Sequence, residues 1–122
     1  MARVLTPDIC VIGAGSGGLT VAAAAAAFGV DVVLVEKGKM GGDCLNYGCV
    51  PSKALISASR RAQNARTGSE FGVNADGVKV DFAEVHGHVH SVIAAIAPHD
   101  SVERFEGLGV TVIQEAGRFV SR

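Results

Sequence analysis

The chain has 122 residues, about the size of one domain built around one hydrophobic core. Its residues are 48% hydrophobic but only 5% aromatic, so the core has to be built mainly from Ala, Val, Ile and Leu. The formal net charge of -1 and a pI near 6.4 argue against a nucleic-acid partner, which would require a basic face, and no apolar run reaches the length of a membrane span.

The first part of the chain has the pattern of a βαβ unit. Two short, almost continuous apolar runs, at 8–12 and 31–35, are typical of strands buried on both faces in a parallel sheet. Between them lie a glycine turn at 13–18 and an alanine-rich helix at 19–28. Cys10, inside the first run, is expected to be a small buried hydrophobe. This order of elements predicts an α/β fold.

The middle of the chain is expected to be mostly helical. A helix is predicted from residue 44 to about residue 66, with interruptions near Gly48 and Pro51. A polar, glycine-bearing surface loop is predicted to follow at 67–79.

The last third begins with a helix start signal. Asp81 and Glu84 have the spacing of a capping box, which predicts a helix from there to about residue 97. Pro98 is expected to end that helix, and Asp100 to cap a shorter one that runs through residue 105. Two short strands are predicted after it, at 110–113 and 118–120.

A Gly-x-Gly-x-x-Gly sequence follows the first predicted strand and opens the first predicted helix. In a dinucleotide-binding turn Gly13 would allow the tight bend, Gly15 would let the backbone approach a pyrophosphate, and Gly18 would let the helix pack closely on the strand. The helix N-terminus would offer free N–H groups to the phosphates. Glu36, at the end of the second strand, would bind ribose hydroxyls and repel a 2′-phosphate. The alternative is a glycine turn that only permits tight packing.

Cys44 and Cys49 need an explanation of their own, because three cysteines in a small chain do not make a disulfide scaffold. Metal binding is disfavoured, since structural zinc usually needs four ligands. In a regular helix, residues five apart have Cα atoms about 8.6 Å apart, whereas a disulfide needs less than about 7 Å. A bridge therefore requires a distorted turn, which Gly48 and Pro51 can supply. A strained, exposed bridge is easily reduced, and Lys53 near a helix start would stabilise a thiolate, so a redox role is favoured over a structural one.

Residues 41–55, G-G-D-C-L-N-Y-G-C-V-P-S-K-A-L, resemble the active-site signature of the flavin-dependent pyridine nucleotide–disulfide oxidoreductases. The glycine turn and Glu36 are similar to the FAD-binding N-terminus of that family, and the resemblance runs over essentially the whole chain. The P-S-K after the second cysteine is closer to the dihydrolipoamide dehydrogenase and mercuric reductase branches than to glutathione reductase. Asp43 departs from the pattern, because many members carry Thr there. The resemblance implies a Rossmann-like FAD-binding domain with a parallel sheet.

The resemblance also implies a role for each matched residue. Cys49 would lie against the flavin as the charge-transfer thiolate, and Cys44 would be the thiol that exchanges with the substrate. Lys53 would lie near flavin N5 and favour the reduced, anionic flavin. Electrons would run from NAD(P)H to FAD, then to the disulfide and on to the substrate. The FAD contacts are expected at Gly13, Gly15, Gly18, Glu36, Lys37, Gly42, Asp43, Lys53 and Gly117.

Members of this family are several times longer than this chain. They carry a second glycine-rich domain for NAD(P)H and a dimerisation domain, so residues 1–122 are expected to be the FAD-binding part of a longer, homodimeric chain and not to turn over alone. The implied substrate is a small-molecule or lipoyl-type disulfide, or a metal ion. The short polar start lacks a signal-peptide pattern, so a cytoplasmic location is expected. The alternatives are a non-catalytic module that binds an adenine dinucleotide and a fragment that binds nothing.

Four histidines invite a metal interpretation. His86 and His90 are four residues apart and would share one helix face, whereas His88 would point elsewhere. Apart from Glu84, no carboxylate or cysteine joins them at ligand spacing. A solvated helix face is therefore expected, without a metal site, and His99 is interpreted in the same way.

Overall fold

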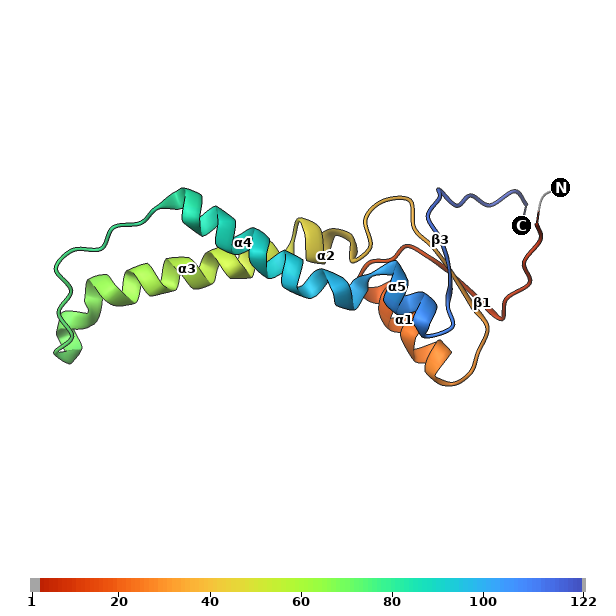
Figure 1. The fold of residues 1–122 in the computed structure, drawn as a ribbon, viewed down its shortest axis with the longest axis horizontal. Coiled ribbons are helices and arrows are strands. Elements are labelled where there is room, and N and C mark those ends of the chain that lie inside the picture. Colours follow the sequence, from red (N-terminus) through yellow and green to blue (C-terminus); the bar gives the residue numbers. More distant parts are fainter. Residues whose placement is uncertain (1–2, 122) are drawn as a thin grey trace.

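The computed structural model describes residues 3–121 and has two visibly different parts (Figure 1). A small parallel sheet with helices packed on it forms one end of the molecule. From that end a pair of long helices projects as an antiparallel hairpin, so the molecule is elongated.

Three parallel strands form the sheet, in the order β1-β2-β3. They are β1 (Ile9–Ile12), β2 (Val32–Val35) and β3 (Thr111–Ile113). Ile9 lies opposite Val32 where β1 meets β2, and Val33 lies opposite Thr111 where β2 meets β3. All three are rich in β-branched residues, which suit a pleated sheet. The α/β fold with a parallel sheet is confirmed.

Helix α1 (Ser16–Ala27) connects β1 to β2 and packs on both strands. It begins within the glycine turn, three residues before the start that the alanine-rich pattern indicated, because Gly15 already acts as its N-cap. The helix ends at Ala27 with Phe28 as its C-cap, and Gly29 follows with φ +74°, a left-handed conformation that suits glycine.

One hydrophobic core lies between the sheet and the helices α1 and α5 (Val102–Gly107). Small alanine side chains let α1 lie close to the strands, and Phe105 of α5 fills the remaining space with 1% of its surface exposed. The core side chains are Val11, Ala14, Leu19, Ala22, Ala25, Val32, Leu34, Phe105 and Val110.

The opposite face of the sheet has no helix on it in the described part of the chain. Side chains alternate along a strand, so Val11 points into the core while Cys10 and Ile12 point away from it. Cys10 is exposed, and Ile12 is 56% exposed. The prediction of a first strand buried on both faces, with Cys10 as a buried hydrophobe, is therefore wrong.

The long helix predicted in the middle of the chain is two helices. Helix α2 (Gly42–Asn46) and helix α3 (Cys49–Thr67) are separated by a break that includes Gly48, as predicted. Pro51 does not interrupt α3, because it lies in the first turn, where a backbone N–H has no intrahelical partner to lose. A 3-10 turn, η1 (Gly68–Phe71), and a loop then lead to the next helix.

Helix α4 (Phe82–Ile96) returns along α3 and completes the hairpin. The Oδ1 atom of Asp81 accepts hydrogen bonds from the backbone N–H groups of Ala83 and Glu84, at 2.9 and 3.3 Å. The N-cap predicted at Asp81 is therefore confirmed. A 3-10 turn, η2 (Ala97–Asp100), follows α4.

The cap of α5 is Ser101 and not, as predicted, Asp100. The Ser101 Oγ accepts a hydrogen bond from the Arg104 N–H at 3.2 Å. Asp100 still belongs to the η2 turn, whereas Ser101 has the extended backbone that a cap requires, with φ -77° and ψ 158°.

The strand predicted at 118–120 is absent. Phe119 and Val120 are 86% and 87% exposed and have no strand backbone. A strand needs a neighbouring strand for its backbone hydrogen bonds, and the described sheet has none beside this tail. None of the helices between residues 3 and 121 is long and apolar enough to span a membrane.

Candidate functional site

The turn between β1 and α1 requires glycine at two of its positions. Gly13 has φ +102°, which L side chains rarely adopt. A Cβ on Gly18 would overlap the carbonyl oxygen of Gly13 and lie 3.2 Å from Cγ1 of Val11. The tight bend predicted at Gly13 and the close helix–strand packing predicted at Gly18 are thus confirmed.

Gly15 caps α1, and the space beside it is open. Its backbone is extended, with φ -80° and ψ -175°, and no atom lies within 4 Å of the position that a Cβ would occupy. Among the described residues no side chain caps the helix, so the N–H groups of its first turn are free to bind a ligand. An open helix N-terminus after a parallel strand is a site where phosphate groups bind.

Glu36 follows β2 and is buried, with 9% of its surface exposed. Its Oε2 accepts a hydrogen bond from the Ala14 N–H at 2.6 Å, and its Oε1 accepts one from the Gly38 N–H, also at 2.6 Å. The carboxylate therefore ties the end of β2 to the glycine turn.

A cavity of about 330 Å³ opens beside Glu36, and it brings together residues far apart in the sequence. Four of its lining residues, Gly13, Glu36, Lys37 and Gly117, were predicted as site residues. Gly117 lies close to β2, because a Cβ there would stand 3.4 Å from Cγ1 of Val35. Glu115 also lines the cavity and was not predicted as a site residue; the only available signal was its place two residues before Gly117.

Cys44 and Cys49 form a disulfide across the break between α2 and α3, with their Cα atoms 4.7 Å apart. The chain comes close to itself there, since a Cβ on Gly48 would lie 2.9 Å from the carbonyl oxygen of Asp43. The distorted turn predicted for a bridge is confirmed. We call residues 41–49 the disulfide loop.

Asn46 holds the disulfide loop together. Its side-chain Nδ2 donates to the carbonyl oxygens of Met40 and Gly42, at 3.1 and 2.9 Å, and the group is partly buried. Sequence reasoning missed this residue. The available signal was its type, because asparagine side chains commonly bind backbone groups of nearby loops.

The disulfide loop rests directly on the glycine turn. The Gly41 N–H donates to the Ala14 carbonyl oxygen at 2.9 Å. Gly42, with φ +58°, comes so close that a Cβ on it would lie 2.7 Å from the Gly15 Cα. Cys44 and Ser16, from the two motifs, line one cavity of about 430 Å³. The two motifs therefore form one continuous site.

Lysine side chains lie both beside Glu36 and near the disulfide loop. Lys37 lines the cavity beside Glu36. Lys53 is exposed on α3, four residues after Cys49, so the two side chains leave the helix on the same face. The Lys39 Nζ lies 5.3 Å from the ring centroid of Tyr47, in the disulfide loop.

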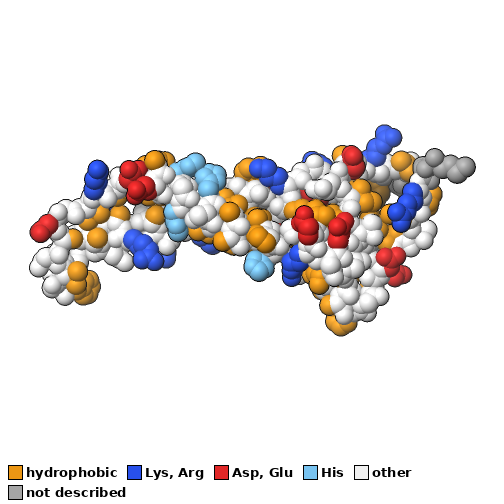
Figure 2. All heavy atoms as spheres, in the orientation of Figure 1, with side chains coloured by type: hydrophobic (Ala, Val, Ile, Leu, Met, Phe, Trp, Pro, Cys, Tyr) orange, Lys and Arg blue, Asp and Glu red, His pale blue; other side chains and the backbone are white. Residues whose placement is uncertain are grey.

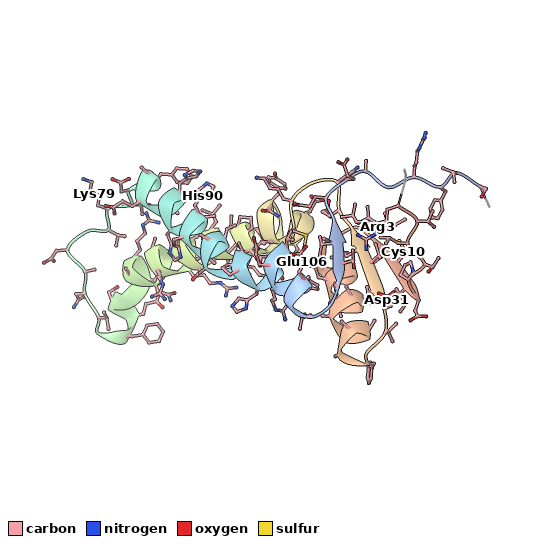
Figure 3. All side chains as sticks on the ribbon, turned by 45° about the vertical axis from the view of Figure 1, so that its right-hand side comes forward. Arg3, Cys10, Asp31, Lys79, His90 and Glu106 are labelled. Carbon is pink, nitrogen blue, oxygen red and sulfur yellow. A yellow bond between two sulfur atoms is a disulfide. The ribbon has the colours of Figure 1, made fainter. Side chains whose placement is uncertain are left out.

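The third cysteine, Cys10, is not part of the disulfide loop and lies in the sheet, as Figure 3 shows.

The parallel sheet and its glycine turn define a Rossmann-like α/β domain, and a disulfide loop rests on that turn. The family described as "Pyridine nucleotide-disulphide oxidoreductase" matches residues 7–119, and the chain belongs to this family.

The curated relatives point to one branch of the family. Dihydrolipoyl dehydrogenase of Geobacillus stearothermophilus is 52% identical over 86 residues, which are 70% of this chain and 18% of that protein. Dihydrolipoyl dehydrogenase of Haloferax volcanii is 41% identical over 113 residues, which are 92% of this chain and 23% of that protein. The chain thus spans about a fifth of the length of these relatives.

A solved structure supports the fold. The Cu(II) complex of the HOCl-induced flavoprotein disulfide reductase RclA from Escherichia coli matches with a TM-score of 0.70. The match has 23% sequence identity and covers 91% of this chain and 22% of that one. At this identity the likeness shows the fold alone.

Proposed function

We propose that this chain is the FAD-binding and redox-disulfide part of a dihydrolipoyl dehydrogenase-like flavoprotein. The observation that carries the proposal is the contact between its two motifs, in which Gly41 and Gly42 seat the disulfide loop on an open helix N-terminus. A module that only bound a dinucleotide would have no use for a disulfide at that place. The similarity to dihydrolipoyl dehydrogenases supports the same proposal.

The residues present fit FAD. The open space at Gly15 and the free N–H groups of α1 suit a pyrophosphate, whose charge a helix N-terminus favours. Both oxygens of Glu36 already accept one N–H each, but each keeps lone-pair capacity for a ribose hydroxyl. The cavity lined by Gly13, Lys37 and Gly117 would hold the adenine end.

Three further residues are assigned to the part of FAD nearer the disulfide. Gly42 is assigned to FAD because it lies directly against Gly15, at the open N-terminus of α1. Asp43 is exposed in the first turn of α2 and, while ionised, can only accept hydrogen bonds, so we assign it to an FAD hydroxyl and not to a phosphate. Lys53 would place positive charge beside the flavin, on the helix face that carries Cys49.

Bound FAD would supply the two-electron connection between NAD(P)H and the disulfide. Two electrons break the bond between Cys44 and Cys49 and leave each sulfur as a thiol or thiolate. Cys44 then attacks one sulfur of a substrate disulfide, which forms a mixed disulfide and releases one substrate thiolate. Cys49 next attacks the Cys44 sulfur, which restores the internal disulfide and releases the second substrate thiolate. The same steps in reverse oxidise a dithiol.

We assign a lipoyl-type dithiol or disulfide as the substrate in preference to a metal ion, because both relatives described above are dihydrolipoyl dehydrogenases. An NAD(P)H domain and a homodimer in a longer chain belong to the same proposal. The cytoplasmic location stays a prediction.

Absorption spectroscopy of the FAD-loaded chain tests the two cysteine roles. In Cys44→Ser, the Cys49 thiolate would lie beside the flavin and should give a new long-wavelength band without any added reductant. Cys49→Ser should lack the band, and the control Cys10→Ser should behave like the wild type. A band in Cys49→Ser but not in Cys44→Ser would reverse the two roles. Identical spectra of both variants would contradict the redox assignment.

A further inference from the structure

Helix α4 carries two histidines whose ring nitrogens converge. His86 and His90 are four residues apart, and their Nε2 atoms lie 3.1 Å from each other. The ring centroids are 4.4 Å apart, and the ring planes cross at 70°. Both side chains are exposed, and histidines gather over α4 on the surface seen in Figure 2, while Figure 3 labels His90.

The separation of these nitrogens suits two bonds to one metal ion. Imidazole nitrogens bind Zn²⁺ at about 2.0–2.1 Å, so two such nitrogens stand about 2.9 Å apart at a right angle and about 3.4 Å apart at the tetrahedral angle. The observed 3.1 Å lies between these limits. Without a metal the same arrangement permits one hydrogen bond between neutral rings, in which one nitrogen donates and the other accepts.

We propose that His86 and His90 form a bidentate site for a divalent transition-metal ion, with water in the remaining coordination positions. Imidazole suits Cu²⁺, Ni²⁺ and Zn²⁺, and Cu²⁺ is expected to bind most tightly of the three. The sequence pattern alone favoured a solvated helix face, and the convergence of the two nitrogens is the observation that changes this interpretation.

The described residues provide no cluster of three or more His, Cys, Asp or Glu side chains suited to a metal. The site therefore has two protein ligands on an exposed helix. Such an ion exchanges with solvent, and it is not a structural ion on which folding depends.

The chain offers a matched control for this site. His88 lies two residues from each partner on the same helix, and it lines a cavity between α3 and α4 together with Arg61 and Glu84. Cys10 is an exposed free thiol that would itself react with Cu²⁺, so the test uses a Cys10→Ser background. The Cys44–Cys49 disulfide is left oxidised and offers no thiolate.

The experiment titrates the 122-residue Cys10→Ser chain with Cu²⁺, followed by calorimetry and by electron paramagnetic resonance. One equivalent should bind and show nitrogen coordination. His86→Ala and His90→Ala should each weaken binding about tenfold or more, because one arm of the chelate is lost. His88→Ala should bind as tightly as the parent.

Equal Cu²⁺ affinity in the parent and in either His86→Ala or His90→Ala would overturn the proposal. An equal loss in His88→Ala would overturn it as well, since binding would then not depend on the converging pair. All three side chains are exposed, so the variants should keep the circular dichroism spectrum of the parent.

Discussion

Glu36 supports the site before any ligand is bound. Its buried carboxylate accepts the N–H groups of Ala14 and Gly38 and so fixes the glycine turn to the end of β2. Loss of Glu36 therefore affects both the fold and the proposed ribose contact. A drop in FAD affinity alone would not separate these two effects, so the ligand-free chain is the informative state.

Replacing Glu36 with alanine should lower the free energy of unfolding of the ligand-free chain by about 1–3 kcal/mol, because two backbone donors lose their acceptor. Urea unfolding followed by circular dichroism measures this. Glu115→Ala removes an exposed carboxylate from the same cavity and should change stability by less than about 0.5 kcal/mol. If the two variants unfold at the same urea concentration, Glu36 does not hold the turn.

Asn46 fixes the segment of chain that leads into Cys44. Its side chain donates to the Gly42 carbonyl oxygen in the disulfide loop and to the Met40 carbonyl oxygen just before it, and so it limits how far the reduced loop can open. Its effect should therefore appear in the equilibrium between dithiol and disulfide, as well as in stability.

Asn46→Ala should disfavour the Cys44–Cys49 disulfide by about 1–2 kcal/mol, the scale of two lost hydrogen bonds, which is about a 5- to 30-fold change in the equilibrium constant. Mass spectrometry of alkylated thiols in glutathione buffers measures this constant. Asn64→Ala, at an exposed position of α3, is the control and should leave it unchanged. If both variants keep the wild-type dithiol–disulfide equilibrium constant, Asn46 does not position the cysteines.

The sequence predicts the structural role of a residue best where that role follows from the residue type alone. Gly13 and Gly18 were expected for reasons of bend and packing that the structure bears out. The contacts of Asn46 and the place of Glu115 depend on how two distant loops fold back, and no local pattern reports this. The prediction that Cys10 is buried was wrong, because an apolar strand pattern does not indicate which face of the sheet a helix covers.

At the scale of elements, the junction of β1 and α1 shows how two neighbouring glycines differ. Both Gly17 and Gly18 lie in the first turn of α1. A Cβ on Gly17 would meet no atom within 4 Å, whereas a Cβ on Gly18 would overlap the Gly13 carbonyl. Only the second glycine is required for the helix to lie against the strand.

Gly18→Ala should lose about 1–3 kcal/mol of unfolding free energy, because backbone must move to admit the methyl group. Gly17→Ala should be neutral or stabilising by up to about 1 kcal/mol, because alanine is the better helix former. Urea unfolding of the two variants side by side measures the difference. Equal stability would contradict the close packing of α1 on β1.

The elements whose signal is local were predicted well. Apolar strands β1 and β2, the cap at Asp81 and the break near Gly48 all follow from short patterns. The predicted strand at 118–120 is absent because a strand depends on a neighbouring strand. Asp100 is not the cap of α5 because it still belongs to the 3-10 turn η2, so the extended backbone of a cap falls at Ser101.

At the scale of the whole molecule, the site lies at the α/β end, and the α3–α4 hairpin extends away from it (Figure 1). Helix α4 has no buried residue and α3 has only Ala54, so the hairpin contributes little to the core. The sequence indicated both helices but not their projection from the sheet, because that depends on contacts between segments far apart in the sequence, such as those between α3 and α4, and not on any helix-forming pattern.

The proposed function requires that the glycine turn and the disulfide loop form one FAD site. The most direct measurement is a flavin-fluorescence titration of the 122-residue chain with FAD, in the wild type and in Gly15→Val. Gly15 has an extended backbone and open space, so valine should leave the fold intact but fill the room that a pyrophosphate needs. Gly87→Val, at an exposed and open position of α4, is the control. We expect saturable one-to-one FAD binding by the wild type and by Gly87→Val, and no binding by folded Gly15→Val. Binding retained by Gly15→Val, or absent from the folded wild-type chain, would contradict the proposed function.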